Sequence, residues 1–291
     1  MRISRKELKE RVIESYSLLR ECTLCPRKCG VSRIKGETGI CRIGIKPRVS
    51  SYGLHFGEER ILVGKRGSGT VFFAGCPLKC VYCQNFTISQ LLEGNDISNL
   101  TLAKIFLLVQ QQGALNLNLV TPSHVVPMIL QALYIVYDEF HLPIVYNTGG
   151  YDSVETLRLL EGVIDIYMPD IKYGDNENSK KYSHCQDYWD VVRKAIKEMQ
   201  RQVGDLVIEN GIATRGLLIR HLVLPDELAN SRKVLEFIKT EVSPDASINV
   251  MNQYHPAYKA YSYPELSRPI KIDEYQKVVE FALNLGLRIV E

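Results

Sequence analysis

The sequence predicts a mixed α/β fold built from repeated strand–helix units, arranged as an open or closed βα barrel. Short, near-continuous apolar runs alternate with longer segments in which apolar residues recur at helical spacing. The chain has 291 residues, of which 45% are hydrophobic and 24% charged, so one catalytic domain with a small extension is expected. A doubly wound sheet would give the same alternation, and periodicity alone leaves both arrangements open.

The N-terminal part, residues 1–65, is expected to form a helix followed by a cysteine-rich extension that binds metal. Apolar residues such as Leu8, Val12 and Leu19 recur at helical spacing over residues 5–20. Residues 21–44 then hold four cysteines among glycines, which is typical of a loop wrapped around a metal.

The core domain is expected over residues 66–291, after a glycine-containing turn at residues 65–69. Apolar, β-rich runs predict strands at 70–74, 117–121, 143–147, 164–169, 216–222, 247–252 and 287–290. Helical patterns lie between them at 100–111, 126–139, 153–160, 191–201, 229–240 and 273–285.

Charge and hydropathy exclude several classes of protein. The formal net charge of +3 gives no clear nucleic-acid signal and none for an anionic membrane. The N-terminus is charged rather than apolar, and no apolar run is long enough to span a bilayer. We therefore expect a cytoplasmic protein without a membrane partner. In a reducing compartment, its eight cysteines are expected to bind metal more readily than to form disulfides.

The sharpest feature is the run GCPLKCVYC at residues 75–83, which spaces Cys76, Cys80 and Cys83 as C-x3-C-x2-C. Three thiolates from one loop would leave the fourth iron of a 4Fe–4S cluster open to a chelating ligand. The loop follows the first core strand, and βα barrels place their active sites at that end of their strands. A zinc site is the alternative, but no Cys or His follows closely enough in sequence to complete it.

A second cysteine group, Cys22, Cys25, Cys29 and Cys41, has the spacing C-x2-C-x3-C-x11-C. Four thiolates saturate a cluster or close a tetrahedral zinc site, and these ligands do not separate iron–sulfur from zinc. A structural or electron-conducting role is expected, because no coordination position remains open.

The C-x3-C-x2-C loop, with the aromatic Tyr82 before its third cysteine, resembles the cluster motif of the radical S-adenosylmethionine superfamily. The resemblance covers roughly residues 70–291 and implies a partial (βα)6 TIM-like barrel of the radical SAM type. More narrowly, the chain resembles the enzymes that activate pyruvate formate-lyase, in a branch with an N-terminal cysteine cluster. The runs CTLCPRKCG at 22–30 and NQYHP at 252–256 carry that narrower match.

The resemblance implies that the open iron binds S-adenosylmethionine and that one electron cleaves it to a 5′-deoxyadenosyl radical. It also implies a one-electron donor such as flavodoxin or ferredoxin. A glycyl radical enzyme would be the protein substrate. Modification of another peptide, a nucleic acid or a small molecule is the alternative, and a non-catalytic iron–sulfur electron carrier is a remote one.

Family motifs at the strand ends imply further cofactor-binding residues. The family's Gly-Gly-Glu element is replaced by TPSH at 121–124, where Ser123 or His124 would bond the cofactor's amino group or else begin a helix. The family's Asp-Thr-Asn-Gly turn corresponds to Asn147 and Thr148, and its Met-Leu-Asp-Leu-Lys motif to MPDIK at 168–172. A monovalent cation can be held where these two motifs meet, lined by Met168 and Asp170.

Three basic residues complete the implied cofactor site. Lys172 would pair with the cofactor carboxylate, although a solvated lysine at a strand exit is the commoner case. Arg220 lies in an apolar strand and needs an acidic partner, either the cofactor or Asp170. His255 matches a family histidine near the adenine, or is a core residue. Cys185, by contrast, has no partner in sequence and no assigned role.

Overall fold

A computed structural model describes residues 1–290 of the chain. Seven parallel strands form the central sheet in the order β10-β9-β8-β6-β5-β4-β2, and the antiparallel β1 and the short β3 continue it beyond β2. Their bounds are β2 Ser68–Phe73, β4 Leu117–Val120, β5 Ile144–Thr148, β6 Ile166–Pro169, β8 Ile212–Leu222, β9 Ser247–Met251 and β10 Arg288–Ile289. The curved sheet does not close, so the predicted partial barrel is confirmed.

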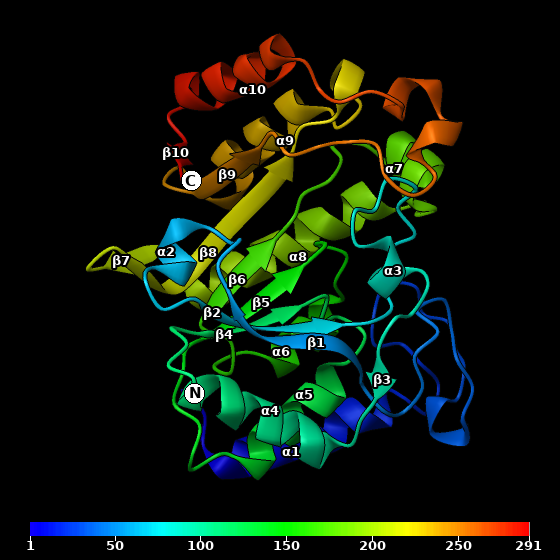
Figure 1. Ribbon diagram of the computed structural model, residues 1–291, viewed down its shortest axis with the longest axis vertical. Helices are drawn as coiled ribbons and strands as arrows, with labels where there is room; N and C mark the ends of the chain where they lie inside the picture. The colour runs from blue at the N-terminus through cyan, green and yellow to red at the C-terminus, as the bar shows by residue number, and fades with distance from the viewer. Residues whose placement is uncertain (291) are drawn as a thin grey trace.

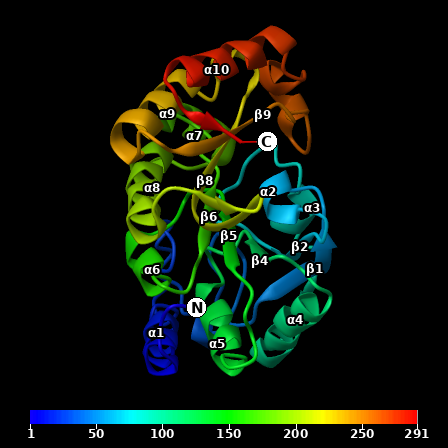
Figure 2. The same ribbon diagram turned by 90° about the vertical axis from the view of Figure 1, so that its left-hand side faces the viewer.

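Helices cover the outer face of this sheet, as the alternating pattern predicts (Figures 1 and 2). They are α4 Asn99–Gln111, α5 Val126–Ile135, α6 Val154–Leu159, α8 Tyr188–Val203, α9 Ser231–Phe237 and α10 Ile272–Asn284. Alternate strand residues such as Leu119, Tyr146 and Tyr167 point outward and join the main hydrophobic core beneath the helices. The intervening residues therefore face the barrel interior, where the site lies.

A smaller apolar cluster fills one end of the barrel interior. Val145, Ile166 and Leu218, from three neighbouring strands, pack around Leu62 of the short helix α2 (Arg60–Val63). Figure 2 shows α2 on the side of the strands away from the outer helices. The segment that enters α2 consequently brings Glu58 and Glu59 into the barrel, above this apolar plug.

The N-terminal segment packs against the same sheet and helices. Helix α1 (Arg5–Ser17) begins with a capping box between Ser4 and Glu7 and packs on α5. Strand β1 (Arg48–His55) pairs with β2, and β3 (Asn95–Asp96) pairs with the start of β1. The cysteine-rich loop between α1 and β1 lies at the edge toward which the parallel strands run (Figure 1).

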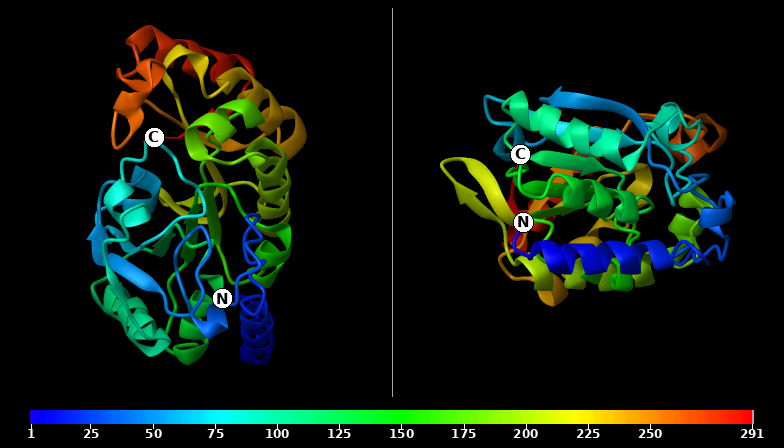
Figure 3. Two further views of the ribbon diagram at one scale, coloured as in Figure 1. Left: turned by 90° about the vertical axis from the view of Figure 1, so that its right-hand side faces the viewer. Right: turned by 90° about the horizontal axis from the view of Figure 1, so that it is seen from below.

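Several elements were not expected from the sequence. Strand β1 and the β7 (Val207–Glu209)–β8 hairpin were missed, because only the apolar parallel strands give a strong signal. The polar helix α7 (Asn176–Ser183) and the one-turn helix α3 (Phe86–Ser89) were also missed. Short 3-10 turns occur at Arg33–Lys35, Pro225–Glu227, Ala260–Ser262 and Pro264–Leu266, and a π-helical turn at Ile238–Val242. Figure 3 shows the β7–β8 hairpin, in yellow, projecting from the body of the protein. Within residues 1–290, no helix is both long and apolar enough to cross a membrane.

Candidate active site

The carboxyl ends of the parallel strands surround a cavity of about 200 Å³. The loop after β2 contributes Cys76, Cys80 and Cys83 to its lining, and β5 and the segment just after β6 contribute polar side chains. The same wall includes the sequence-predicted residues Tyr82, Asn147, Thr148, Asp170, Lys172 and Arg220. Residues from six separate segments of the chain are thus brought to one place, as the barrel topology predicts.

The cysteine loop, residues 75–83, is held by specific contacts. The Ser183 hydroxyl donates to the Cys80 sulfur over 2.9 Å, and the Cys83 sulfur lies 3.1 Å from the Ser89 hydroxyl. Burial, reinforced by Cys80 and Cys83, raises the pKa of the Cys76 thiol to about 12. A bound metal would reverse this, because coordinated thiols lose their protons.

The donor set fits an iron–sulfur cluster with one open iron. Three soft thiol ligands come from one loop and border a cavity that also carries Lys172 and Arg220, two cations able to meet an anionic ligand. As the side chains stand in residues 1–290, no three His, Cys, Asp or Glu groups are already placed to hold a metal ion.

Tyr82 fixes the cysteine loop to two other parts of the barrel. Its ring meets Tyr173 and Tyr254 edge-on, with centroids 6.3 and 5.9 Å away. Edge-to-face aromatic pairs of this kind add stability beyond the area they bury. The aromatic residue before the third cysteine therefore anchors the loop by packing, while one side of it lines the cavity.

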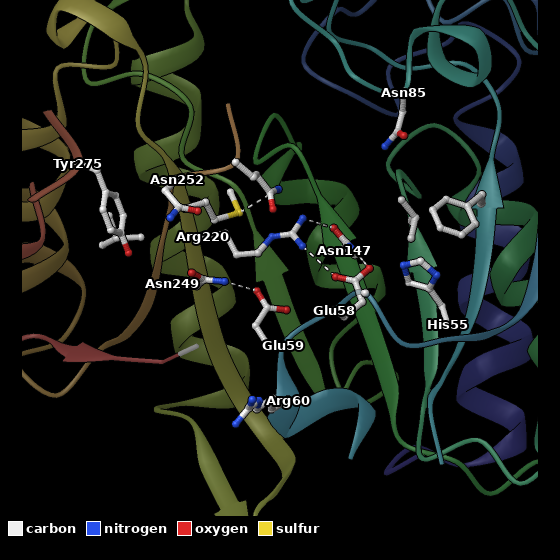
Figure 4. Close-up of a pocket in the computed structure, with 16 residues that line it drawn as sticks. His55, Glu58, Glu59, Arg60, Asn85, Asn147, Arg220, Asn249, Asn252 and Tyr275 are labelled. Carbon is white, nitrogen blue, oxygen red and sulfur yellow. Dashed lines mark hydrogen bonds and ion pairs between the residues drawn. The ribbon is translucent and has the colours of Figure 1, made fainter. Parts of the chain in front are cut away.

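Arg220 lies at the centre of a buried charge network (Figure 4). Its Nε donates to Asp170 over 2.8 Å, one terminal nitrogen to Glu58 over 3.1 Å, and the other to the Asn147 amide oxygen over 2.8 Å. Lys172 binds the second oxygen of Asp170 over 2.7 Å. The acidic partner that the sequence required for Arg220 is Asp170, joined by Glu58, which the sequence did not reveal.

The network sets the protonation of its two carboxylates differently. Burial alone would raise the pKa of Asp170, but the charges of Arg220 and Lys172 outweigh it and lower the pKa to about 2. Burial raises the pKa of Glu58, and Arg220 only partly offsets this increase. Asp170 is therefore a fixed anion, whereas Glu58 is the carboxylate that accepts a proton more easily.

Glu58 and Glu59 were missed by sequence reasoning because they lie in the extension, just before α2, far in sequence from the ends of the predicted strands. Glu58 also accepts from the amides of Asn118 and Asn147, over 3.3 and 3.4 Å. Glu59 accepts a 2.9 Å hydrogen bond from Asn249 on β9. An adjacent acidic pair after a β-strand was the only available signal, and such pairs are common on surfaces.

Ser123 and His124 are not part of the cavity lining. The Ser123 hydroxyl lies 3.1 Å from that of Thr148, and His124 Nε2 lies 2.8 Å from the carbonyl oxygen of Ala74. Burial lowers the pKa of His124 to about 3, so the ring is neutral. Neither residue caps α5, whose N-cap is Val125. Thr121 is the residue of this segment that lines the cavity.

The expected place for a monovalent cation is taken by the protein's own cations. Both carboxylate oxygens of Asp170 bind Lys172 or Arg220, and the Asn147 amide oxygen accepts from Arg220. Thr148 instead donates to the buried Asp152 over 2.6 Å, and Met168 packs in the apolar plug. The oxygens that would bind the ion thus accept from the protein's own cations in this structure, and the monovalent cation stays a prediction.

His255 lies outside the cavity walls and is exposed. Its Nδ1 lies 3.2 Å from the amide nitrogen of Gln84, which does line the cysteine cavity. The neighbouring Tyr254 is the buried residue of this run. His255 therefore meets the cavity walls from outside, through Gln84 and through the carbonyl oxygen of Gln253, 3.3 Å from its Nδ1.

A second, wider cavity of about 670 Å³ opens beside the first. It lies at the seam of the open barrel, with His55 and Phe72 on one side and Asn249 and Tyr275 on the other (Figure 4). Six residues line both cavities: Asn85, Val120, Asn147, Arg220, Met251 and Gln253. The two cavities are consequently adjacent parts of one site.

The four N-terminal cysteines lie next to the cysteine loop. Cys22, Cys25 and Cys41 are buried, and Cys29 is partly exposed. Burial raises the pKa of Cys25, and the other three thiols are near enough to add to the effect. Arg27 ties the two regions together, because its Nε donates to the carbonyl of Pro77 over 2.8 Å. Cys185 is buried elsewhere, with its thiol 3.6 Å from Asp187.

Comparison with known proteins shows the family of the chain. No family model matches the sequence. The chain is 34% identical over 284 residues to the uncharacterised protein MJ0674 of Methanocaldococcus jannaschii, with 94% of this chain and 78% of that protein aligned. The uncharacterised protein MJ0808 of the same organism is 21% identical over 297 residues, with 92% and 79% aligned.

Solved structures show the same fold at low sequence identity. A radical SAM methyltransferase from Sphaerobacter thermophilus superposes with a TM-score of 0.52 at 13% identity, over 77% of this chain and 65% of that one. SuiB of Streptococcus suis, in complex with S-adenosylmethionine, superposes with a TM-score of 0.51 at 12% identity, over 74% and 48%. The chain thus spans less than two thirds of each. It belongs to the family of MJ0674, and its fold is that of the radical SAM proteins.

Proposed function

We propose that this protein is a radical S-adenosylmethionine enzyme. The observation that carries the proposal is the convergence of Cys76, Cys80 and Cys83 with a pair of buried cations on one cavity at the strand ends. When bound, a 4Fe–4S cluster on these thiols would supply the electron that cleaves S-adenosylmethionine to a 5′-deoxyadenosyl radical.

The chain's own residues would position the cofactor. Lys172 lines the same cavity as Cys80 and Cys83, on the segment that follows β6. It can pair with a carboxylate while Asp170 holds it in place. Asn147, Thr148 and Arg220 line the neighbouring wall and offer polar contacts to a ribose. Tyr82 keeps the loop in register through its aromatic packing.

The N-terminal cysteines would form a second metal site, as an iron–sulfur cluster or zinc. What supports this proposal is their burial in one loop region and its attachment to the cysteine loop through Arg27. An iron–sulfur centre here could pass electrons from flavodoxin or ferredoxin in the cytoplasm. Zinc would make the site purely structural.

The substrate class is proposed to be a peptide or protein. SuiB, which shares the fold with a TM-score of 0.50, is described in complex with its precursor peptide SuiA. The wide cavity at the barrel seam offers room for a side chain to enter beside the cofactor cavity. Activation of a glycyl radical enzyme is one form of this proposal, and it rests on the sequence resemblance at the strand ends 147–150 and 168–172 and in the runs 22–30 and 252–256.

The test is reductive cleavage of S-adenosylmethionine by anaerobically reconstituted protein. Dithionite-reduced wild-type protein is expected to produce 5′-deoxyadenosine, detected by liquid chromatography, and Cys80→Ala to produce none. Cys185→Ala is the matched control, because this buried cysteine lies outside both cavities. Cleavage that is absent from wild type, or retained by Cys80→Ala, would reject the enzyme class. A persistent organic radical on a co-purified protein would favour glycyl radical activation over other peptide modification.

A further inference from the structure

One carboxylate in the wide cavity lacks the partner that its burial requires. Glu59 is only 6% exposed and lines the cavity, yet its Oε2 has no hydrogen-bond partner among the described residues. Its other oxygen accepts a single bond from Asn249. A buried carboxylate without a donor is costly, so such a group in a ligand-sized cavity points to a ligand that completes it.

We propose that Glu59 binds the charged end of an alkylammonium group of the substrate, such as a lysine side chain. This inference deepens the proposed function, on which it rests, by naming the chemistry that the substrate presents. It assigns to the segment before α2 a role in substrate recognition.

The charges around Glu59 support a cationic ligand. Asp170 is matched by Lys172, and Glu58 is matched by Arg220. All three side-chain nitrogens of Arg220 already donate hydrogen bonds, to Asp170, Glu58 and Asn147. Arg220 and Glu59 attract each other electrostatically, but no hydrogen bond joins them. Glu59 is therefore the carboxylate left over once the buried ion pairs are counted. A primary ammonium brings both the missing charge and the missing donors.

The walls of the cavity suit the alkyl part of such a group. Part of the cavity lining is apolar, contributed by Phe72, Val120, Val250 and Met251. A chain of methylene groups gains by burying against this surface while its charged end reaches Glu59. Figure 4 shows Glu59 and Asn249 below Arg220, and Asn252 and Tyr275 also line this cavity.

The position also suits a substrate of a radical enzyme. The cavity of Glu59 shares Val120, Asn147 and Arg220 with the cavity of the cysteine loop. A group anchored at Glu59 would consequently lie in the cavity next to that of the cofactor, with only the residues that line both cavities between the two. Fixing one end of the substrate in this way positions its reacting carbon relative to the radical.

The experiment measures the binding of defined probes to the cluster-containing protein with S-adenosylmethionine, kept oxidised so that no turnover occurs. The probes are Nα-acetyl-lysine N-methylamide, its neutral norleucine counterpart and n-pentylammonium. Wild type is expected to bind the lysine probe about tenfold more tightly than the norleucine probe, and Glu59→Gln to lose that preference. The control Glu139→Gln, which changes an exposed carboxylate in the turn after α5, should keep the preference. Tighter binding of the lysine probe than of n-pentylammonium would identify a peptide as the source of the amine, and the reverse order a small molecule.

Equal binding of lysine and norleucine probes by wild type, or a preference that survives Glu59→Gln, would overturn the inference. Thermal unfolding guards against a misfolded variant: Glu59→Gln should melt no lower than wild type, because it removes an incompletely paired buried charge. Cleavage of S-adenosylmethionine in the absence of substrate, measured for wild type and for Glu59→Gln, separates the two proposals. Cleavage without any lysine preference in wild type rejects only the role of Glu59, whereas absent cleavage in wild type rejects the enzyme class.

Discussion

Replacing Arg220 by methionine should destabilise the protein by about 3–5 kcal/mol, the usual cost of breaking a buried ion pair from one side. The Arg220 side chain is 15% exposed, and those of its partners Glu58 and Asp170 are 10% and 16% exposed. Asp170 keeps Lys172 in the variant, whereas Glu58 keeps only amide donors. Protonation of Glu58, whose pKa burial already raises, limits the loss. The free energy of unfolding is measured by urea denaturation followed by circular dichroism.

The matched control is Arg201→Met, which removes an arginine that also contacts two carboxylates. Arg201 makes four hydrogen bonds to Glu161 and Glu198, more than Arg220 makes to its carboxylates, but its side chain is 52% exposed. Solvent-screened pairs of this kind contribute about 0–1 kcal/mol. Equal losses for the two variants, or a larger loss for Arg201→Met, would refute the reasoning that burial rather than contact number sets the cost.

Two further predictions concern the buried His221 on β8 and Gly75 in the cysteine loop. Burial lowers the pKa of His221 to about 4 in the folded protein. In the unfolded chain this histidine takes up a proton already as the pH falls below about 6.5. The free energy of unfolding therefore decreases between about pH 6.5 and pH 4. Unfolding free energies of wild type should therefore fall by about 2 kcal/mol more than those of His221→Gln between pH 7 and pH 5, and parallel curves would contradict this. Gly75→Ala should lower both iron content and melting temperature, because φ is 81° there and a Cβ would lie 2.7 Å from the Cys41 carbonyl oxygen. Gly113→Ala is the control for backbone strain alone, because φ is 84° there and the space around it is open. If Gly113→Ala loses as much iron as Gly75→Ala, the contact between the two cysteine regions does not explain the loss.

The sequence was sufficient to predict the parallel strands, because strands buried on both sides are continuous apolar runs with a length typical of βα units. It also brought Asn147, Asp170 and Arg220 together, since the carboxyl ends of parallel strands share one edge. The pairing of Asp170 with Arg220 was one of two alternatives, and the structure selects it.

The remainder of the site depends on long-range packing that leaves no local pattern. Glu58 reaches Arg220 across 162 residues of sequence, from a segment whose position is fixed by β1 and by the apolar plug around Leu62. Helix α7 is short and polar, so it lacks the run of apolar residues that predicts a helix, and tertiary contacts place it. The position of His124 was equally hidden, because a buried neutral histidine and a ligand-binding one look alike in sequence.

The most direct test of the account is electron paramagnetic resonance of a variant in which Cys22, Cys25, Cys29 and Cys41 are all alanine. Only Cys76, Cys80 and Cys83 then remain to hold a cluster at the strand ends. After anaerobic reconstitution and reduction, we expect the signal of one 4Fe–4S cluster, and we expect S-adenosylmethionine to change that signal by binding the open iron. Zinc in place of iron, or a cluster signal indifferent to S-adenosylmethionine, would contradict the central claim.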